Sequence, residues 1–592
     1  MSSKKYHTEW NLNVILNKFH AESIESLISQ ENQKYTDFFN KWNIKNIVEN
    51  IETLLEYLDE FNRILEDHGK YLVASAYTSL RLSLNSEDNE AKSLENKIFD
   101  IEKYIQQNFE SYRQKIVKYL KENPDIVKDS KFAKYKHFLE LMLEESKYKL
   151  SEEGENIIFA LSKTVLSNWK DLTSRLLSTS TGKIKDNGEQ KEYTFEELLT
   201  ISTKDTSKIK RDKAVYALNK IFEKWSPVIE TEINSVLEYS KTIDELRKYS
   251  DPEEKRLFYD EVSKQFVNSL INAVKNNYSF SREYYKTKAK LLGKRKLKYN
   301  ERLLKYGDVQ QRFSSGEAIN LVHKGLNEIG AEYGQIFEQM LIDGRIDFLP
   351  KKGKRGGAFF MGFAKQIPGF ILLNYTGTIN DISTIAHETG HAIHFELTRA
   401  NQPGIYCDYS TAIAEVASTF FEDLVADFVL GDMKRDDDKI AFIVNKLDDF
   451  ISSVHRQIAI YSFERRLHEE FKNKGYLSSK DIDQMFIEEM SDYLGNSVDM
   501  KGFEKYWVYI NHIRYFFYVY SYASGLIISK TLQTLYKENR ENINKVKHVL
   551  SAGCSNYVKD IFSEIGLDVE DENFWRIGLE NNNIYLEEIK RR

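Results

Sequence analysis

The chain has 592 residues, of which 84 are Lys or Arg and 91 are Asp or Glu, and its formal net charge is −7. This mixed, mildly acidic composition gives no electrostatic reason to expect a nucleic-acid partner. Six prolines and 27 glycines are too few for a collagen-like, proline-rich disordered or turn-dense all-β protein, so long helices are expected.

The two cysteines, Cys407 and Cys554, are too few for a disulfide framework in a chain of this size. Residues 1–10 contain no apolar stretch of the kind found in a secretory signal. The longest aromatic and apolar run, residues 515–529, is about 15 residues long, whereas a membrane span needs roughly 20. We therefore expect a cytoplasmic protein with no membrane partner; the oligomeric state is not readable from the sequence.

From Tyr6 to about Leu177, apolar residues recur at spacings of three and four between charged ones. This pattern predicts amphipathic helices that pack into a bundle. The polar run of residues 178–191 contains two glycines and an Asn187-Gly188 pair, which indicates a linker or an exposed hairpin. We therefore predict an N-terminal helical domain of residues 1–190 and a second, larger domain of residues 191–592.

Helical patterning resumes at Thr194 and continues to about Gly344, with candidate helix ends at Pro227, at the turn of residues 250–252 and at Gly293. Residues 345–378 combine glycine-rich turns with two short β-prone runs, which predicts a small hairpin or sheet. Helical patterns dominate again after residue 378. The predicted fold class is mostly α with one small β element.

Residues 387–391 read His-Glu-Thr-Gly-His, an HExxH motif. The flanking pattern predicts a helix over residues 381–400, capped by Asn380 or Asp381. In such a helix His387 and His391 lie one turn apart, about 6 Å along the axis and about 40° around it, so both imidazoles can bind one ion. Glu388 lies about 100° from His387, where a general base for a metal-activated water belongs.

A catalytic zinc ion needs a third protein ligand. The zincin branch with a third histidine would need Gly at 394 and His at 397, but the chain has His394 and Leu397. A downstream acid is therefore expected.

The candidate acids are Glu396, Glu415, Glu422 and Asp423. Glu396 would face about 140° away from His391 on the same helix. Glu415 stands among small and apolar residues, where an acid is costly unless it binds a metal or forms a buried salt bridge. Glu422 shares a helix face with Glu415 and would either support a metal-binding histidine or lie on the surface. Two packed histidines without any metal are the alternative to this whole interpretation.

Five segments, residues 354–358, 371–377, 384–394, 408–418 and 512–525, resemble the thimet oligopeptidase family of zinc metallopeptidases, and more closely its oligoendopeptidase F branch. The resemblance implies a large multi-helix ellipsoid with a deep central substrate channel and a small β sheet beside the active-site helix. It also implies one zinc ion per chain and short unstructured peptides as substrates, with residues 191–592 as the catalytic domain.

Carried onto this sequence, the resemblance assigns zinc to His387, His391 and Glu415 and the general base to Glu388. It suggests that Gly390 lies in the helix because another element approaches closely there. His394 is expected to support a ligand or face the substrate, or else to be an ordinary packed histidine.

The aromatic run of residues 506–522 supplies hydrogen-bond donors for a tetrahedral oxyanion. His512, Tyr515 and Tyr518 recur at three-residue spacing and Tyr522 follows four residues later, which predicts one helical face. The family uses a His and a Tyr from this region, but the spacing is equally typical of an aromatic core stripe.

Gly357 and Ala358 leave a backbone edge to which an extended peptide could hydrogen-bond, although an ordinary structural hairpin would look the same. The sequence as a whole predicts a zinc-dependent endopeptidase for short oligopeptides. The alternatives are a metallocarboxypeptidase or dipeptidyl carboxypeptidase on the same scaffold, and a non-catalytic peptide-binding protein.

Overall fold

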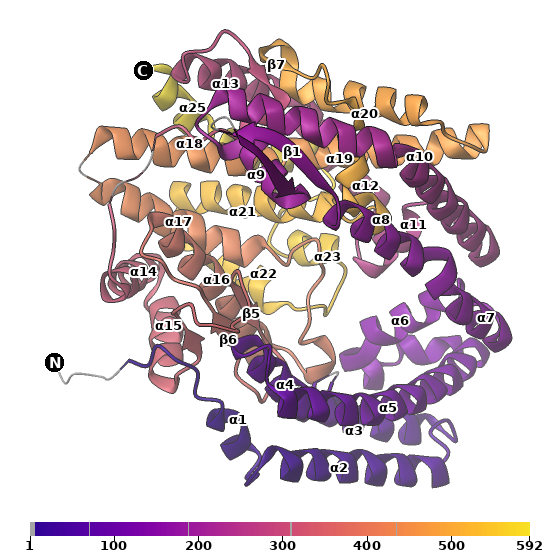
Figure 1. Ribbon diagram of the computed structural model, residues 1–592. Helices are drawn as coiled ribbons and strands as arrows, with labels where there is room; N and C mark the ends of the chain where they lie inside the picture. The colour runs from indigo at the N-terminus through magenta and orange to yellow at the C-terminus, as the bar shows by residue number, and fades with distance from the viewer. Residues whose placement is uncertain (1–5, 70, 187–188, 308, 310, 434) are drawn as a thin grey trace.

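The computed structural model describes residues 6–69, 71–186, 189–307, 309, 311–433 and 435–592, and helices dominate this part of the chain (Figure 1). The predicted fold class, mostly α with a small β element, is confirmed. The strands of the described residues form three small sheets of two or three strands each. No helix in the described ranges has the length and hydropathy that crossing a bilayer requires.

The N-terminal part, drawn in indigo and violet at the lower end of Figure 1, is a helical bundle with an aromatic core. The rings of Phe38, Phe39 and Phe109 lie 5.2 to 5.9 Å apart by their centroids. The elements of this part are α1 (Asn13–Lys18), α2 (Ile24–Ile44), α3 (Ile51–His68), α4 (Val73–Leu84), α5 (Asn89–Glu122) and α6 (Lys136–Glu145). The core also includes five residues from much later in the chain: Ala364, Ile367, Phe370, Ile405 and Tyr406.

Helices α7 (Glu152–Ser162) and α8 (Asn168–Ser178) lead into a hairpin of β1 (Thr181–Asp186) and β2 (Glu189–Thr194). The strands are antiparallel, with Thr181 opposite Thr194. The polar run is therefore a hairpin; its turn, Asn187 and Gly188, lies outside the described residues. The domain boundary at residue 190 falls inside β2 and stays a prediction.

A long helix, α10 (Lys208–Arg247), follows α9 (Phe195–Lys204) and contains Pro227, so the helix end predicted at that proline is wrong. Proline lacks the N–H that would bond to the carbonyl of residue 223, four residues earlier. The hydroxyl of Ser226 donates to that Glu223 carbonyl at 3.3 Å, which gives the acceptor a partner. The other two predicted ends agree with the structure, because α10 stops before the turn at 250–252 and α13 stops before Gly293.

The small sheet predicted within residues 345–378 is confirmed. Its order is β4 (Ile346–Asp347), β6 (Phe370–Leu372) and β5 (Phe359–Met361), with β4 parallel and β5 antiparallel to β6, so β5 is an edge strand. A second small sheet pairs β3 (Leu297–Lys298) with β7 (Val498–Asp499). The helices between α10 and β4 in the chain are α11 (Glu254–Tyr259), α12 (Lys264–Asn276), α13 (Tyr278–Leu291), α14 (Ser315–Ile329) and α15 (Ala331–Asp343).

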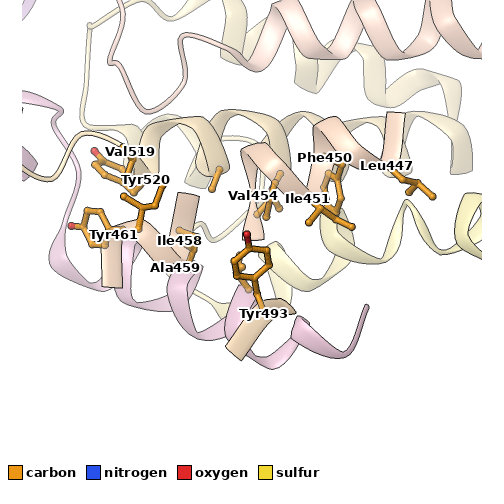
Figure 2. Packing of buried hydrophobic residues seen from close by; sticks show 14 of the residues in the cluster. Leu447, Phe450, Ile451, Val454, Ile458, Ala459, Tyr461, Tyr493, Val519 and Tyr520 are labelled. Carbon is orange, nitrogen blue, oxygen red and sulfur yellow. The ribbon is translucent and has the colours of Figure 1, made fainter. Parts of the chain in front are cut away.

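The C-terminal part of the chain is helical and shares a large second core with the elements that follow residue 177. Its helices are α16 (Ile379–Asn401), α17 (Val416–Asp432), α18 (Asp436–Ser453), α19 (His455–Lys474), α20 (Ser479–Leu494), α21 (Tyr520–Glu538), α22 (Ile543–Ser551), α23 (Val558–Ser563), α24 (Glu572–Glu580) and α25 (Asn583–Lys590). Figure 2 shows part of this core, where Leu447 and Ile451 of α18 lie in one apolar row with Ile458 of α19 and Tyr520 of α21 nearby. This packing fixes which face of α18 is turned away from the core.

Candidate metal centre

The HExxH motif lies on α16, whose start is two residues earlier than predicted. The cap is Thr378 rather than Asn380 or Asp381. Thr378 and Asp381 form a reciprocal capping box, in which the Asp381 carboxylate also accepts from the backbone N–H of Thr376 at 3.0 Å. Three backbone donors at the helix start are thereby satisfied, which anchors the first turn of the helix that carries the histidines.

His387, His391 and Glu415 come together at one point. The Nε2 atoms of His387 and His391 lie 3.4 and 3.5 Å from Oε2 of Glu415. Two ligands of a tetrahedral zinc ion, each about 2.0–2.1 Å from the metal, stand about 3.3 Å apart. Among the described residues this is the one group of His, Cys, Asp and Glu side chains close enough to hold a metal ion. The donor set fits zinc in both chemistry and spacing.

The close approach of α16 and α17 depends on Gly390. A Cβ atom at this position would lie 2.6 Å from Cα of Ser418 and 2.7 Å from the carbonyl oxygen of Ala417. Glu415 is the N-cap residue of α17, so the distance between the two helices sets the distance from Glu415 to the histidines. Gly525 of α21 allows a similar contact, since a Cβ there would lie 2.9 Å from Cβ of Glu415.

The Glu415 side chain carries the negative charge that a cation ligand needs. Burial raises its pKa, but hydrogen bonding and charge from His391 and His387 outweigh burial and bring the pKa to about 2. Ser418 Oγ donates to Oε2 of Glu415 at 2.8 Å and helps to fix the carboxylate. Glu415 is therefore ionised at neutral pH, as a metal ligand must be.

Glu422 supports His387 from the next turns of α17. Its Oε2 lies 2.9 Å from Nδ1 of His387, so a proton on Nδ1 is donated to the carboxylate and Nε2 is left to face Glu415. Burial lowers the pKa of His387, but the hydrogen bond and the charge of Glu422 outweigh it and raise the pKa to about 9. The carboxylate thus fixes the ring orientation and increases its basicity.

Glu388 is buried, with 7% of its surface exposed, on the side of α16 that faces β5. Burial raises the pKa of its carboxyl group, while the charges of His387 and His391 and a hydrogen bond from the Phe360 backbone act in the opposite direction. A carboxyl group with a raised pKa beside three candidate metal ligands is suited to accept a proton and to release it again.

The remaining acid candidates are engaged elsewhere. Glu396 pairs with Arg399 and Arg345 on the far side of α16. Asp423 binds Lys446 at 2.9 Å and Lys530 at 2.6 Å. The geometry leaves Glu415 as the carboxylate that meets both histidines.

His394 lies outside the cluster. Its ring is fully buried and stacks on Tyr409, with centroids 3.9 Å apart and an angle of 12° between the rings. Neither ring nitrogen has a hydrogen-bond partner among the described residues, and burial lowers the pKa of His394 to about 3. The ring is therefore neutral and packed at ordinary pH.

The single helical face predicted for residues 512–522 is wrong. A 3₁₀ turn over Asn511–Arg514 stops, Phe516 and Phe517 adopt positive φ angles of 49° and 55°, and α21 starts only at Tyr520. Such angles are strained for bulky residues. The break is held by the Phe517 N–H, which donates to the buried Glu464 carboxyl group at 2.8 Å.

The break separates the aromatic candidates. Tyr522 is near both His512 and Tyr518, with ring centroids 6.0 and 5.3 Å apart, and it lines a cavity together with His387 and Glu415. Tyr515 instead is 59% exposed and lies beneath the amino group of Lys170 at 4.3 Å. His512, Tyr518 and Tyr522 form one group, and Tyr515 stands apart from it.

Gly357 and Ala358 precede the edge strand β5 and line a cavity of about 210 Å³ together with Thr384 and Ile385 of α16. Gly357 is exposed and has a φ of 79°, a conformation that favours glycine. The side chain of Asn374 donates to the Gly357 carbonyl at 2.7 Å, which fixes the segment before β5.

The larger cavity beside His387 brings in residues that no sequence pattern singles out. Lys446 and Asp449 reach it from α18, Lys530 from α21, and Asn582 from the turn before α25. None belongs to a motif, and all stand far from residue 387 in the chain. Only the packing of α21 against α17 and of α18 against α21 reveals them.

Two protein-family models match parts of this chain. Residues 202–580 match the model of peptidase family M3, and residues 114–179 match that of Oligopeptidase F. Group B oligopeptidase PepB of Streptococcus agalactiae is 25% identical over 467 residues, which cover 77% of this chain and 75% of the relative. An oligoendopeptidase F homolog of Lactococcus lactis is 24% identical, and the alignment covers 92% of this chain and 91% of the relative.

Two solved structures share the fold. A crystal structure from Chlamydophila abortus superposes with a TM-score of 0.86 at 20% identity, over 99% of this chain and 98% of the other. Oligoendopeptidase-F from Enterococcus faecium superposes with a TM-score of 0.67 at 17% identity, over 96% of this chain and 99% of the other. The model of peptidase family M3 matches more than half of the residues of this chain, so the chain belongs to that family.

Proposed function

We propose that the protein is a zinc-dependent endopeptidase that cleaves internal bonds of short, unstructured peptides. The observation that carries the proposal is the convergence of His387, His391 and Glu415, with Glu388 buried beside them. Membership of a peptidase family and the names of the relatives support the substrate class.

A zinc ion held by these three ligands would supply Lewis-acid chemistry, which polarises a carbonyl group and makes water acidic enough to ionise near neutral pH. Glu388 accepts the proton as water attacks the scissile carbonyl and then delivers it to the departing amine. Its raised pKa lies nearer to neutrality, so the carboxylate is a better proton acceptor and its acid form can still donate. Glu422 holds His387 in the ligating orientation throughout.

His512, Tyr518 and Tyr522 are the donors we propose for the oxyanion that develops on the attacked carbonyl. Burial lowers the pKa of His512 and raises that of Tyr522, so the imidazole is neutral and the phenol keeps its proton. Arg256 lies over the Tyr518 ring, 5.0 Å from its centroid, and holds that side chain in place. The exposed position of Tyr515 under Lys170 favours a role for it in substrate entry over one at the carbonyl.

The peptide backbone is proposed to bind along β5. This strand pairs with β6 on one side and has no strand partner on the other in the described part of the sheet. An extended peptide added at this edge would lie against the α16 side that carries Glu388. Hydrogen bonds to the peptide main chain do not depend on the side chains of the peptide, which fits an oligopeptidase of broad sequence specificity.

The test compares wild type with Glu388→Gln and with Glu538→Gln, an exposed glutamate of α21, using an internally quenched peptide blocked at both ends. Wild type and the control should cleave it, lose activity with a zinc chelator and regain it with zinc. Glu388→Gln should hold the same zinc and lose activity by about 10²-fold or more. Full activity of that variant would refute the proposed base.

The same assay separates the alternatives. Cleavage that requires a free carboxyl terminus would replace the endopeptidase with a carboxypeptidase. Zinc bound in equal amount without any cleavage would indicate a peptide-binding protein.

A further inference from the structure

A cavity of about 570 Å³ opens directly beside the metal cluster. Its walls come from α16, α17, α18 and α21, and it is lined by His387 and Glu415 as well as by Tyr522. This volume is typical of sites for small ligands or side chains. A group bound in the cavity therefore lies next to the bond that the cluster would cleave.

The two lysines in the cavity wall are already neutralised. Lys446 binds Asp423 at 2.9 Å and Asp427 at 3.0 Å, and Lys530 binds Asp423 at 2.6 Å. With their charges engaged, neither is available to recognise an anionic group such as a peptide carboxylate. Recognition of an anion in this cavity is disfavoured.

Asp449 also lines the cavity, but unlike Asp423 it has no lysine partner. It makes no hydrogen bond or ion pair with any described residue, and its side chain is exposed to the cavity. Its residue spacing places it with Asn445 and Ser453 on the side of α18 opposite Leu447 and Ile451, two of the core residues in Figure 2. Although the side chain is open to the cavity, partial loss of solvent around its carboxyl group and the charges of Asp448 and Glu422 raise its pKa to about 7, against the opposing charge of Lys288. A cation in the cavity would relieve this concentration of negative charge.

Asn582 provides an independent sign that the cavity takes a ligand. Its side chain lines the cavity and is fully buried, yet neither its carbonyl oxygen nor its amide nitrogen has a hydrogen-bond partner among the described residues. Buried carboxamides normally have partners. The free oxygen is suited to accept from an N–H donor of a bound group.

Phe442 and Phe450 of α18 and Leu526 of α21 add apolar surface to a wall that is otherwise largely polar. A long alkyl chain that ends in a cation matches this combination, because its methylene groups pack on apolar walls while its charged end reaches polar groups. A second metal ion does not match, since Asp449 belongs to no metal-sized group of ligands among the described residues.

We propose that this cavity is a specificity subsite for a basic group of the peptide, an ammonium or guanidinium that pairs with Asp449 and donates to Asn582. The group comes from a lysine or arginine side chain near the cleaved bond or from a free amino terminus. This inference rests on the proposed endopeptidase function and names a preference of the same site.

The test uses zinc-loaded wild type, Asp449→Asn, Asp449→Lys and the control Asp437→Asn, which removes an exposed charge twelve residues earlier on the same helix, about 18 Å away. The substrates are end-blocked, internally quenched peptides in which one lysine, or one glutamate, replaces norleucine at each position in turn. A norleucine peptide with a free amino terminus forms a separate arm. Peptide affinity is also measured on the Glu388→Gln background, where binding is read without turnover.

Lysine at one position should raise kcat/KM by about tenfold or more over norleucine. The advantage should disappear in Asp449→Asn, remain in Asp437→Asn and turn into a preference for glutamate in Asp449→Lys. If only the free amino terminus gives an Asp449-dependent advantage, the subsite binds the terminus. Equal zinc content and circular dichroism establish that the variants fold.

The inference is overturned if wild type cleaves the peptides but no position or terminus shows a preference, or if the preference persists in Asp449→Asn. If wild type cleaves nothing, the proposed function fails, and the binding measurements still decide whether the cavity selects a cation.

Discussion

Replacing Gly390 by alanine should damage the metal site through the backbone. The added Cβ would lie 2.6 Å from Cα of Ser418, whereas unstrained contacts begin at about 3.4 Å, so α17 must move by about 0.8 Å. The atoms in the way belong to the Ala417 and Ser418 backbone, so rotation of a side chain cannot relieve the overlap. We expect the overlap to lower the free energy of unfolding by about 1–3 kcal/mol. The higher helix propensity of alanine offsets part of this loss.

The same shift carries Glu415 away from the histidines. Distances that are now 3.4 and 3.5 Å would exceed 4 Å, beyond what a tetrahedral ion bridges. Zinc affinity should fall by about 10–100-fold or more. Competition with a chromophoric chelator measures the affinity, and urea unfolding of the metal-free protein measures the stability.

Gly431→Ala is the matched control, because Gly431 also lies on α17 but a Cβ added there would have no atom within 4 Å. It should bind zinc like wild type. If Gly390→Ala also bound zinc and unfolded like wild type, the contact between α16 and α17 would not be what fixes the ligand spacing.

Two further predictions concern protons. In the metal-free protein His387 is protonated below its pKa of about 9 and must lose the proton to ligate, so zinc affinity should rise with pH up to about 9 and zinc uptake should release a proton. Glu422→Gln removes the largest of the effects that raise this pKa, so calorimetry in buffers of different ionisation enthalpy should show less proton release from pH 7 to 9; equal release would contradict this. Burial lowers the pKa of His394 and His455 to about 3 and of His468 to about 4, below the unfolded value of about 6.5, so the unfolded chain binds protons first and stability should fall as the pH drops from about 6.5 towards 4. His394→Phe should make that fall shallower in urea unfolding at pH 7.5 and 5, and an unchanged fall would exclude His394 as a contributor.

Local chemistry was readable from the sequence where it depends on one helix. The HExxH spacing places two histidines on one face whatever surrounds them, and an acid among small residues at 415 needed a partner. The helix through Pro227 was not readable, because the Glu223 carbonyl is satisfied by a neighbouring hydroxyl. Nor was the break at Phe516 and Phe517, where a buried carboxyl group from α19 overrides an uninterrupted aromatic pattern. Asp449 and Asn582 line the same cavity as His387 and Glu415 only through tertiary packing, which no periodicity records.

The core of the N-terminal bundle has a consequence for synthesis on the ribosome. Its own helices are complete at residue 145, but Ile405 and Tyr406 occupy the same core. At about 5–20 residues per second, those two side chains are made roughly 13–50 s later. Until then that part of the apolar surface of the bundle stays uncovered, as chaperone-binding surfaces are. The last step of its folding therefore follows the synthesis of the proposed metal ligands His387 and His391.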